Sequence, residues 1–315
     1  MTERILITGC AGYLAQTFID ACKNDAQVDW LGGIDVRPPK KVKDDLHFSS
    51  LDVRSPDIAK LLKENRVTTV MHLAWIFNPT HDPDLEREVD VEGSRNILEC
   101  VQKAEVPYLV YLSSTTSYGP HPDNPQIFDE SYPRRGHHGY LYSKYKAEVD
   151  HMMVDFMTQN PQQQMFVARA PIVLGPNTRN VVTQMTALPV MVGVRGFDPP
   201  MQFIHEQDLQ RLLTWTIHRK PNGIYNVTGL GTIRYSEIMK HLKKPSVWIP
   251  PALIYPALSA LWSMRLVPFP ASILDFVRYP WVASGEKFLE AYDFKPEFSS
   301  EEAFLAYARA RFKNV

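Results

Sequence analysis

The chain has 315 residues, of which 44% are hydrophobic and 22% charged, and its formal net charge at pH 7 is −1. This is the composition of a globular protein with one large or two modest domains. It argues against a nucleic-acid binder, which normally has a basic surplus. The three cysteines, Cys10, Cys22 and Cys100, form no Cys-x-x-Cys or Cys/His cluster, so we expect a reducing compartment and no zinc site. No charged-then-apolar leader precedes the first apolar segment, which favours a cytoplasmic location.

Short apolar segments alternate with amphipathic ones up to about residue 170. The apolar segments predict six buried strands, at Ile5–Thr8, Trp30–Asp35, Phe48–Asp52, Thr69–Ala74, Tyr108–Ser113 and Met165–Ala170. The amphipathic segments predict helices at 13–24, 55–65, 84–105 and 138–159. Because these strands have no polar face, we expect a parallel sheet covered on both sides. The predicted fold is therefore a doubly wound α/β fold, with ligands at the carboxyl ends of the strands.

After residue 170 the pattern is irregular and rich in proline. Residues 201–204 and 223–227 are predicted as strands and 207–217 as a helix, and a last helix is predicted to be capped by Ser299 or Ser300 ahead of Glu302. We expect residues 1–170 to form the sheet domain and 171–315 a smaller substrate lobe, with roughly 201–228 returning to the sheet domain.

Residues 246–264 contain no charged side chain. This length is close to the ~18 apolar residues of a spanning helix. Pro250, Pro251 and Pro256, however, would break the backbone hydrogen bonds for which lipid offers no substitute. We therefore expect no spanning segment. A buried helix of the lobe is the leading interpretation, and an apolar lid, a contact with a membrane surface or an anchor remain open.

The first strand leads into Thr8-Gly-Cys-Ala-Gly-Tyr-Leu-Ala15 and then into a helix. Gly9 permits a sharp turn, and Gly12 lets the backbone approach a pyrophosphate. Tyr13 and Leu14 open the helix, whose N-terminus offers free N–H groups and partial positive charge. A Gly-x-x-Gly pattern alone is also found in structural turns. The strand before it and the helix after it favour a phosphate-binding loop.

Asp35 ends the second predicted strand, about twenty residues past this loop. A carboxylate there accepts hydrogen bonds from the adenosine ribose and repels the additional phosphate of NADP. Arg37 would partly offset that repulsion. Asp52, followed by Val53, closes the third predicted strand and would reach the adenine amino group. The alternative for Asp52 is a helix cap or a turn residue.

Further motifs give the chain a specific resemblance. It resembles the extended short-chain dehydrogenase/reductase family, also called the NAD-dependent epimerase/dehydratase family, over about residues 4–230. The matching motifs, in family order, are Thr8-Gly-x-x-Gly-x-x-Ala15, Asp35, Asp52-Val53, His72-Leu-Ala74, Tyr111-Leu-Ser-Ser-Thr-Thr-Ser-Tyr-Gly119, Tyr140-Leu-Tyr-Ser-Lys144 with Glu148, Arg169-Ala-Pro171, Gly175-Pro176, Phe203-Ile-His-Glu-Gln-Asp208 and Tyr225-Asn-Val227.

This resemblance implies that NAD is the cofactor and that residues 1–170 form an NAD-binding Rossmann domain. It also implies that Leu73, Ala74, Trp75 and Pro171 line the cofactor cleft. An indole at position 75 is equally compatible with simple packing.

Tyr140 and Lys144 lie four residues apart on a predicted helix, hence on one face. A tyrosine has a pKa near ~10, which a nearby ammonium group lowers toward a useful range. The resemblance assigns Ser114 to orient the substrate, Tyr140 to transfer the proton, and Lys144 to tune Tyr140 and hold the nicotinamide ribose.

A second pair, Tyr142 and Lys146, has the same spacing but faces another side of the helix. Alignment on Ser143-Lys144 and Glu148 selects the first pair, so Tyr142 is interpreted as a packing residue.

Three features depart from the family pattern. Thr115 and Thr116 replace the Asp-Glu pair of 4,6-dehydratases, which makes dehydration unexpected. Ile172 replaces an asparagine that grips the diphosphate in nucleotide-sugar epimerases, and Asp90 replaces another asparagine. The later lobe has no basic cluster for a diphosphate, with Arg179 and Arg195 as isolated candidates.

The sequence thus predicts reversible hydride transfer between NAD and a secondary alcohol or ketone of a fairly apolar small molecule, as in members of the family like 3-beta-hydroxysteroid dehydrogenase or dihydroflavonol reductase. The alternative is a nucleotide-sugar 4-epimerase with tightly bound NAD. A non-catalytic NAD sensor is disfavoured because all three predicted catalytic residues are present. Substrate identity, reaction direction and strictness for NAD over NADP stay open. The family resemblance also predicts a homodimer packed through helices 84–105 and 138–159.

Overall fold

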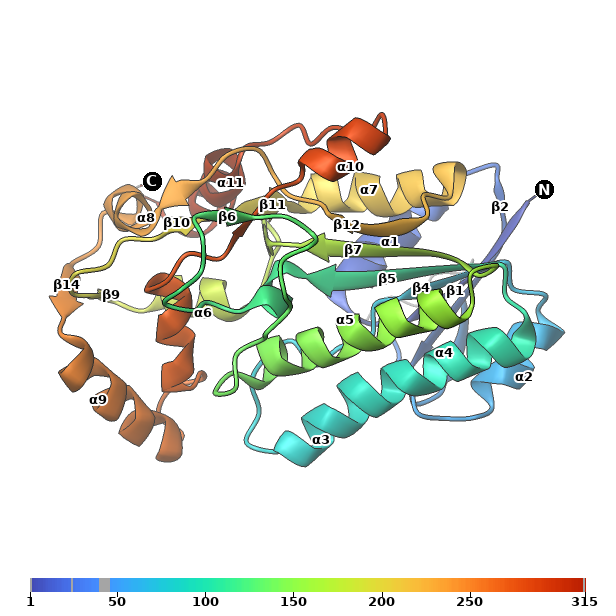
Figure 1. Cartoon of the computed structure of the whole chain (residues 1–315), viewed down its shortest axis with the longest axis horizontal. Coiled ribbons are helices and arrows are strands. Elements are labelled where there is room, and N and C mark those ends of the chain that lie inside the picture. The colour runs from blue at the N-terminus through green and yellow to red at the C-terminus, as the bar shows by residue number, and fades with distance from the viewer. Residues whose placement is uncertain (1, 24, 40–45, 314) are drawn as a thin grey trace.

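The computed structural model describes residues 2–23, 25–39, 46–313 and 315. Its central sheet has seven parallel strands in the order β12-β7-β5-β4-β1-β2-β3. The strands are β1 Glu3–Thr8, β2 Val28–Asp35, β3 His47–Ser50, β4 Thr69–His72, β5 Tyr108–Ser114, β7 Gln164–Ala170 and β12 Gly223–Asn226. This order confirms the predicted doubly wound α/β fold (Figure 1).

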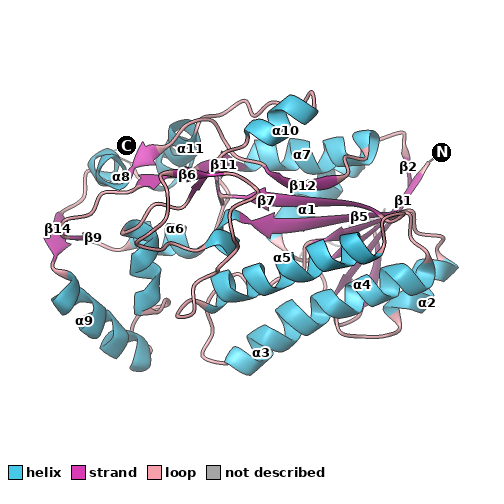
Figure 2. Ribbon diagram, in the orientation of Figure 1, coloured by secondary structure: helices cyan, strands magenta, loops and turns pink. Residues whose placement is uncertain are grey.

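Helices cover both faces of the sheet (Figures 1 and 2). On one face lie α2 (Ile58–Glu64), α4 (Gly93–Ala104) and α5 (Leu141–Gln159), and on the other α1 (Tyr13–Cys22) and α7 (Glu206–Arg219). In β1, Leu6 packs toward the first face, while Ile5 and Ile7 pack toward the second. Both sides of the strand are therefore buried, which explains why the sequence shows a continuous apolar segment rather than an alternating one.

The predicted helix at 84–105 is divided into three parts. These are α3 (Pro83–Arg87), a π-helical turn at Glu88–Glu92 and α4. The π-helical turn contains Asp90, whose Oδ1 accepts a hydrogen bond from the backbone N–H of Ile76 at 2.8 Å. Such turns widen a helix locally and are frequent at functional sites. The third strand is also shorter than predicted, because β3 ends at Ser50 and Asp52 lies in the turn that follows.

The chain after residue 170 builds a second body beside the carboxyl ends of the strands. Two of its elements return to the sheet domain: β12 pairs with β7, and α7 packs against α1. The remaining elements, with the short strand that precedes them, are β6 Ile127–Phe128, β8 Ile172–Leu174, α6 Val181–Ala187, β9 Met191–Val194, β10 Pro200–Met201, β11 Phe203–His205, β13 Ile233–Arg234, α8 Tyr235–Leu242, β14 Ser246–Ile249, α9 Pro251–Ser263, a 3₁₀ helix Ala271–Val277, β15 Val282–Ala283, α10 Glu286–Ala291 and α11 Ser300–Arg311.

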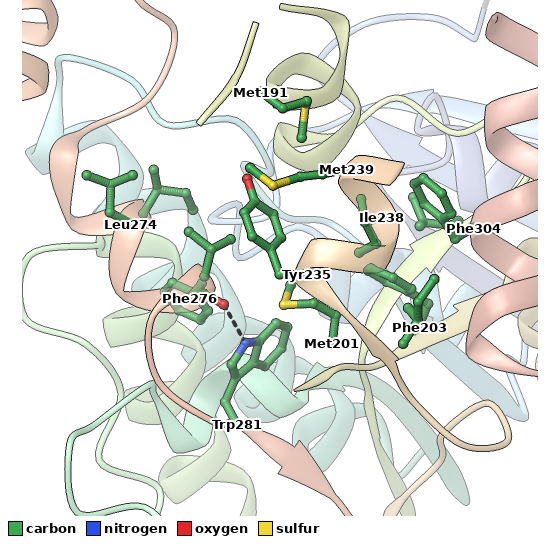
Figure 3. Packing of buried hydrophobic residues seen from close by; sticks show 14 of the residues in the cluster. Met191, Met201, Phe203, Tyr235, Ile238, Met239, Leu274, Phe276, Trp281 and Phe304 are labelled. Carbon is green, nitrogen blue, oxygen red and sulfur yellow. Dashed lines mark hydrogen bonds between the residues drawn. The ribbon is translucent and has the colours of Figure 1, made fainter. Parts of the chain in front are cut away.

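This second body has a hydrophobic core of its own. Figure 3 shows Met201, Tyr235 and Met239 packed between the 3₁₀ helix on one side and Phe304 of α11 on the other. Trp281 is 2% exposed and donates its indole N–H to the carbonyl oxygen of Phe276 at 3.0 Å. The core therefore fixes the 3₁₀ helix, one side of which faces the cleft described below. At the far end, the capping box between Ser299 and Glu302 begins α11, one of the two predicted caps.

The uncharged segment 246–264 forms β14 and then α9, which begins at Pro251 where the prolines predict a break. The leading interpretation of this segment as a buried helix is wrong, because Ile254 alone of the α9 residues is buried. The inner side of α9 packs on the 3₁₀ helix, while its outer side faces solvent. Within the described residues, no helix is both long and apolar enough to cross a membrane.

Candidate active site

A cleft lies at the carboxyl ends of the strands, between the sheet and the second body, and its cavity has a volume of about 780 Å³. This is where doubly wound folds bind their ligands. The cleft brings together all the predicted site residues except Lys144. Those that line it are Gly9, Gly12, Tyr13, Leu14, Asp35, Arg37, Asp52, Val53, Leu73, Ala74, Trp75, Ser114, Tyr140 and Pro171.

The loop between β1 and α1 needs both of its glycines. Gly9 has a φ of +69°, and a Cβ there would lie 2.7 Å from the Cα of Ala74. A Cβ on Gly12 would lie 3.0 Å from the carbonyl oxygen of Gly9. The Thr8 hydroxyl holds the end of β4 against the loop by accepting hydrogen bonds from the N–H groups of Leu73 and Ala74 at 3.2 and 3.1 Å. The helix N-terminus is thus left open to a phosphate, and the loop fits a dinucleotide.

Asp35 lies at the end of β2, partly buried beside this loop. Its Oδ2 accepts a hydrogen bond from the N–H of Ala11 at 3.1 Å, and its Oδ1 accepts one from the N–H of Arg37 at 3.1 Å. The carboxylate therefore faces the end of the cleft where an adenosine ribose would lie. The side chain of Arg37 is exposed at the same end.

Asp52 is a turn residue that also lines the cleft. Its Oδ1 accepts a hydrogen bond from the backbone N–H of Arg54 at 2.8 Å, and the Arg54 guanidinium binds the same carboxylate at 2.8 and 2.9 Å. The hydrogen bonds from Arg54 hold the pKa of Asp52 below its usual range. Asp52 thus lines the cleft as a carboxylate that is already paired with Arg54. It lies in a turn, which was the alternative interpretation of this residue from the sequence.

Tyr13 connects the phosphate loop to the second body. Its hydroxyl donates a hydrogen bond to the carboxylate of Glu206, the first residue of α7. The other oxygen of the Glu206 carboxylate accepts a hydrogen bond from the side-chain amide of Asn177 at 3.0 Å. Gly175 makes room for this carboxylate, because a Cβ there would lie 2.4 Å from Cγ of Glu206. One acidic side chain thus binds both walls of the cleft.

The predicted placement of Tyr140 and Lys144 on one helix face is wrong. Tyr140 is the N-cap of α5 and lies outside the helix, which begins at Leu141. Its buried ring lines the cleft and packs against Phe276 at 5.4 Å between centroids. Lys144 is exposed, and its Nζ lies 5.5 Å from the ring centroid of Tyr145. The two side chains therefore do not share a helix face, and Lys144 is not in the cleft.

The structure brings the second pair into the cleft instead. Tyr142 and Lys146 both line it, and the Lys146 Nζ lies 5.9 Å from the ring centroid of Tyr142. Burial raises the pKa of the Tyr142 phenol, while a hydrogen bond with the Ser114 side chain lowers it. Ser114, Tyr142 and Lys146 are thus the serine, tyrosine and lysine that share one site. The sequence shows the same spacing for both pairs, and the structure places both members of the second pair in the cleft.

Ser114 is held in place by Thr116, one of the two threonines that stand where 4,6-dehydratases have an acidic pair. Thr116 donates to the Ser114 Oγ twice, from its backbone N–H at 3.2 Å and from its hydroxyl at 2.9 Å. Because the serine oxygen already accepts two hydrogen bonds, its own O–H is left to donate. The Ser114 hydroxyl is therefore the donor in its hydrogen bond with the Tyr142 phenol.

Lys146 is buried between aromatic rings and opposite a buried acid. Its Nζ donates to the carbonyl oxygen of Leu112 at 3.0 Å and lies 3.5 Å from the ring centroid of Trp75. Burial lowers the pKa of Lys146 to about 7, against the charge of Asp90, which raises it. Burial raises the pKa of Asp90 to about 8, against the hydrogen bond from Ile76 and the charge of Lys146, which lower it. Asp90 Oδ2 has no hydrogen-bond partner among the described residues.

The other end of the cleft, away from the phosphate loop, is lined mainly by apolar side chains. Ile172, at the position of the family's asparagine, is one of them. The apolar residues there are Ile76, Phe77, Leu85, Val89, Ile172, Val181, Val182, Met185, Met201, Ile273, Phe276 and Val277. Of the described residues that line this end, Arg179 is the one cation. Arg195 does not line the cleft.

A sheet of this topology, a glycine loop open to a phosphate, and a serine, tyrosine and lysine at the strand ends define a dinucleotide-dependent oxidoreductase. A family model described as the NAD dependent epimerase/dehydratase family matches residues 5–228. The chain belongs to this family, and NAD is its cofactor.

Solved structures share the fold over nearly the whole chain. A Thermus thermophilus UDP-glucose 4-epimerase in complex with NAD has a TM-score of 0.73 at 18% identity, covering 98% of each chain. A dTDP-glucose 4,6-dehydratase of Bacillus anthracis in complex with NAD has a TM-score of 0.75 at 17% identity, covering 99% of this chain and 97% of its own.

Curated relatives are also distant. A Mycobacterium tuberculosis protein named only as uncharacterized is 22% identical over 98% of this chain and 84% of its own length. A sterol-4-alpha-carboxylate 3-dehydrogenase (decarboxylating) of Saccharomyces cerevisiae is 28% identical over 57% of this chain and 54% of its own.

Proposed function

We propose that the chain catalyses reversible hydride transfer between NAD and a secondary alcohol or ketone on a largely apolar small molecule. The observation that carries this proposal is the apolar lining of the cleft beyond the catalytic residues. Covering apolar surface there gains on the order of 25 cal/mol per Å². A diphosphate would have Arg179 as its one cation at that end, and a poorly paired phosphate is disfavoured when water is removed. The similarity to the sterol dehydrogenase supports the same substrate class.

In this proposal Tyr142 exchanges a proton with the substrate oxygen, and Ser114, whose side chain hydrogen-bonds Tyr142, turns its O–H to that oxygen when the substrate binds. Lys146 in its ammonium form lowers the pKa of Tyr142 by charge. Bound NAD supplies the hydride acceptor, and its reduced form the hydride donor. Residues of the glycine loop would hold the pyrophosphate, and Asp35 the adenosine ribose. Trp75 covers Lys146 and excludes water from that side of the site.

A substrate panel tests the proposal directly. Purified protein with NAD is offered hydroxysteroids and simple secondary alcohols, and NADH formation is followed by absorbance. We expect turnover to rise with the apolar area of the alcohol. Calorimetry with UDP-glucose and UDP-galactose on the NAD-loaded protein is expected to show only weak binding.

The alternative, a nucleotide-sugar 4-epimerase, rests on Arg179. Micromolar affinity for a UDP-sugar that is lost in Arg179→Ala and kept in Arg195→Ala would establish it, since Arg195 does not line the cleft. Interconversion of the two UDP-sugars without net NADH formation would have the same meaning. Either result would refute the apolar-substrate proposal.

We also propose that the protein is a cytoplasmic homodimer. Helices α4 and α5 lie side by side on one face of the molecule (Figure 1). Along α5, Met152, Phe156 and Met157 are only partly buried. Packing these helices against those of a second copy would cover this apolar surface through a self-complementary two-fold interface. Light scattering at micromolar concentration should give the mass of a dimer, and a monomer would contradict the proposal.

A further inference from the structure

Lys146 has a second hydrogen-bond partner on β5, behind the cleft. Its Nζ donates to the hydroxyl of Tyr111 at 3.4 Å, besides the carbonyl oxygen of Leu112 at 3.0 Å. Tyr111 is 1% exposed and does not line the cleft. This tyrosine therefore lies out of reach of a substrate, and it can act on the reaction only through Lys146.

The Tyr111 hydroxyl is in turn linked to a buried group of charges. It hydrogen-bonds the side chain of Ser113, and the Ser113 hydroxyl donates to Asp150 Oδ2 at 2.7 Å. Asp150 is fully buried and forms ion pairs with Arg169 at 2.6 Å and with Arg134 at 3.0 Å. A continuous series of hydrogen bonds thus connects Lys146 to a carboxylate that two guanidinium groups hold in place.

Two regular spacings bring these side chains together. Tyr111 and Ser113 are two residues apart on β5, and therefore on one face of the strand. Lys146 and Asp150 are four residues apart on α5, and therefore on one face of the helix. Helix α5 covers the face of the sheet on which Tyr111 packs (Figure 1). We call these four residues the buried network.

The carboxylate fixes the direction of each hydrogen bond in the buried network. A hydroxyl carries one proton, and that of Ser113 is used on Asp150, so Tyr111 is the donor in its hydrogen bond with Ser113. Burial raises the pKa of the Tyr111 phenol well above its usual value, which keeps this proton in place. The Tyr111 oxygen therefore offers Lys146 an acceptor and no donor.

This arrangement fits a lysine in its ammonium form. An ammonium group has three N–H donors and no acceptor, whereas the lone pair of a neutral amine needs a donor. The Leu112 carbonyl and the Tyr111 oxygen both accept from Nζ. The ring of Trp75, whose centroid lies 3.5 Å from Nζ, attracts a cation.

We propose that Tyr111 is a positioning residue of the reaction, which together with Ser113 and Asp150 holds Lys146 as an ammonium group beside Tyr142. The effect on turnover rests on the proposed function of Lys146, whereas the effect on the charge of Lys146 does not.

Other titratable groups also face Lys146. Asp90 approaches from the π-helical turn, and the charges of Asp90 and Asp150 both raise the pKa of Lys146 against the effect of burial. Tyr142 lies four residues before Lys146 on α5. His72 of β4 is neutral, because burial and the charge of Lys146 lower its pKa to about 3. Substitutions that remove a hydroxyl but no charge therefore separate the buried network from the electrostatic effects of these groups.

An NMR titration of protein that contains ¹³C-labelled lysine measures the charge of Lys146 directly, and Lys146→Met assigns its resonance. Tyr111→Phe removes one hydroxyl and keeps the ring, whose centroid lies 5.0 Å from the lysine Nζ. The pKa of Lys146 should fall by at least ~0.5 in this variant. Tyr108→Phe is the matched control, since this buried tyrosine of the same strand donates its hydroxyl proton to the carbonyl oxygen of Pro221 at 2.9 Å. It should leave the pKa of Lys146 unchanged.

A double-mutant cycle tests whether the hydroxyls of the buried network act in series. Ser113→Ala breaks the link to Asp150 and should also lower the pKa of Lys146. When Tyr111→Phe has already removed the acceptor, adding Ser113→Ala should lower that pKa little further. Additive effects would show two independent hydroxyls and overturn the proposal. An unchanged pKa in Tyr111→Phe would overturn it too, since Asp150 would then act by its charge alone.

The titrations are repeated in the Asp90→Asn background. Burial raises the pKa of Asp90 to about 8 and lowers that of Lys146 to about 7, so in the wild type the two groups titrate together. In Asp90→Asn only the lysine of this pair titrates. The fall caused by Tyr111→Phe should persist in this background, and its disappearance there would assign the effect to Asp90 and refute the buried network.

The pH–rate profiles then connect the buried network to the reaction. With the best alcohol of the panel, the alkaline limb of Tyr111→Phe should move to lower pH by as much as the pKa of Lys146 falls, while Tyr108→Phe should keep the wild-type limb. A lowered pKa with an unmoved limb would refute the role of Tyr111 in the reaction. A lowered pKa in a protein whose wild type oxidises no alcohol would support the buried network and refute the proposed function.

Discussion

Replacing Tyr142 by phenylalanine separates the two overlapping Tyr/Lys pairs. The proposed proton donor loses its hydroxyl, while its ring keeps the contacts with Trp75 and Phe77 at 6.1 and 5.9 Å between centroids. A general acid–base contributes ~10²–10⁴-fold to turnover, which corresponds to about 3–5 kcal/mol of barrier. One lost hydrogen bond costs stability only about 0.5–1.5 kcal/mol. Turnover should therefore fall by at least ~100-fold in a protein that still folds and binds NAD.

Tyr140→Phe is the matched control, because Tyr140 lines the same cleft and packs on Phe276 through its ring. Its turnover should stay within ~3-fold of the wild type, since phenylalanine keeps the shape of the side chain. Lys146→Met and Lys144→Met form a second matched pair, in which the buried position should be impaired and the exposed one should not. NADH formation with the best alcohol of the panel gives the rates, and fluorescence titration gives the NAD affinity. A large loss in Tyr140→Phe with little effect in Tyr142→Phe would refute the proposed assignment.

Three further predictions follow from the site. The charge of Asp90 raises the pKa of Lys146, which is about 7 with that charge present. In Asp90→Asn this charge is absent, so the ammonium form should be lost at lower pH and the alkaline limb of the pH–rate profile should move to lower pH; an unmoved limb would exclude the coupling. Asp35→Asn keeps an acceptor for the Ala11 N–H but removes the charge, so the ratio of NADP to NAD affinity should rise, and an unchanged ratio would exclude Asp35 as the discriminator. Gly9→Ala should lower the free energy of unfolding twice, through the positive φ and through the contact of the new Cβ with Ala74. Gly231→Ala, at φ +62° with nothing within 4 Å of the new Cβ, should lower it only through the positive φ. The positive φ costs about 1–2 kcal/mol. Urea unfolding should therefore show a greater loss of stability for Gly9→Ala, and equal losses in the two variants would contradict the close approach of Gly9 to Ala74.

Much of the fold could be predicted because the determining signals are local. Ile5, Leu6 and Ile7 are all buried, and such a continuous apolar segment is typical of a parallel strand between two helical layers. The phosphate loop was predictable for the same reason, since the strand, the two glycines and the start of the helix all lie within the first fifteen residues.

The Tyr/Lys pair that lines the cleft could not be identified from local sequence, because both pairs share the same spacing in overlapping residues. What separates them is the start of α5 at Leu141 and the distant carbonyl of Leu112 that binds Lys146. The sequence did contain one signal for the second pair, since Asp150 lies eight residues after Tyr142, just as Glu148 lies eight residues after Tyr140. In the structure Asp150 forms a buried ion pair with Arg169 at 2.6 Å. The exposure of α9 could not be predicted from the sequence, because an uncharged segment has the same composition whether its outer side contacts protein, lipid or water.

The carboxylate of Glu206 joins the two ends of the site. It binds Tyr13 of the phosphate loop and Asn177 of the opposite wall, so neither wall shifts without changing the hydrogen bonds of the other. Filling of the dinucleotide end and shaping of the substrate end are therefore linked. Because such a link is reciprocal, NAD should change the affinity for the substrate by the same factor as the substrate changes the affinity for NAD. Titrating each ligand in the absence and in the presence of the other would measure that factor, and a factor of 1 would show that the two ends act independently.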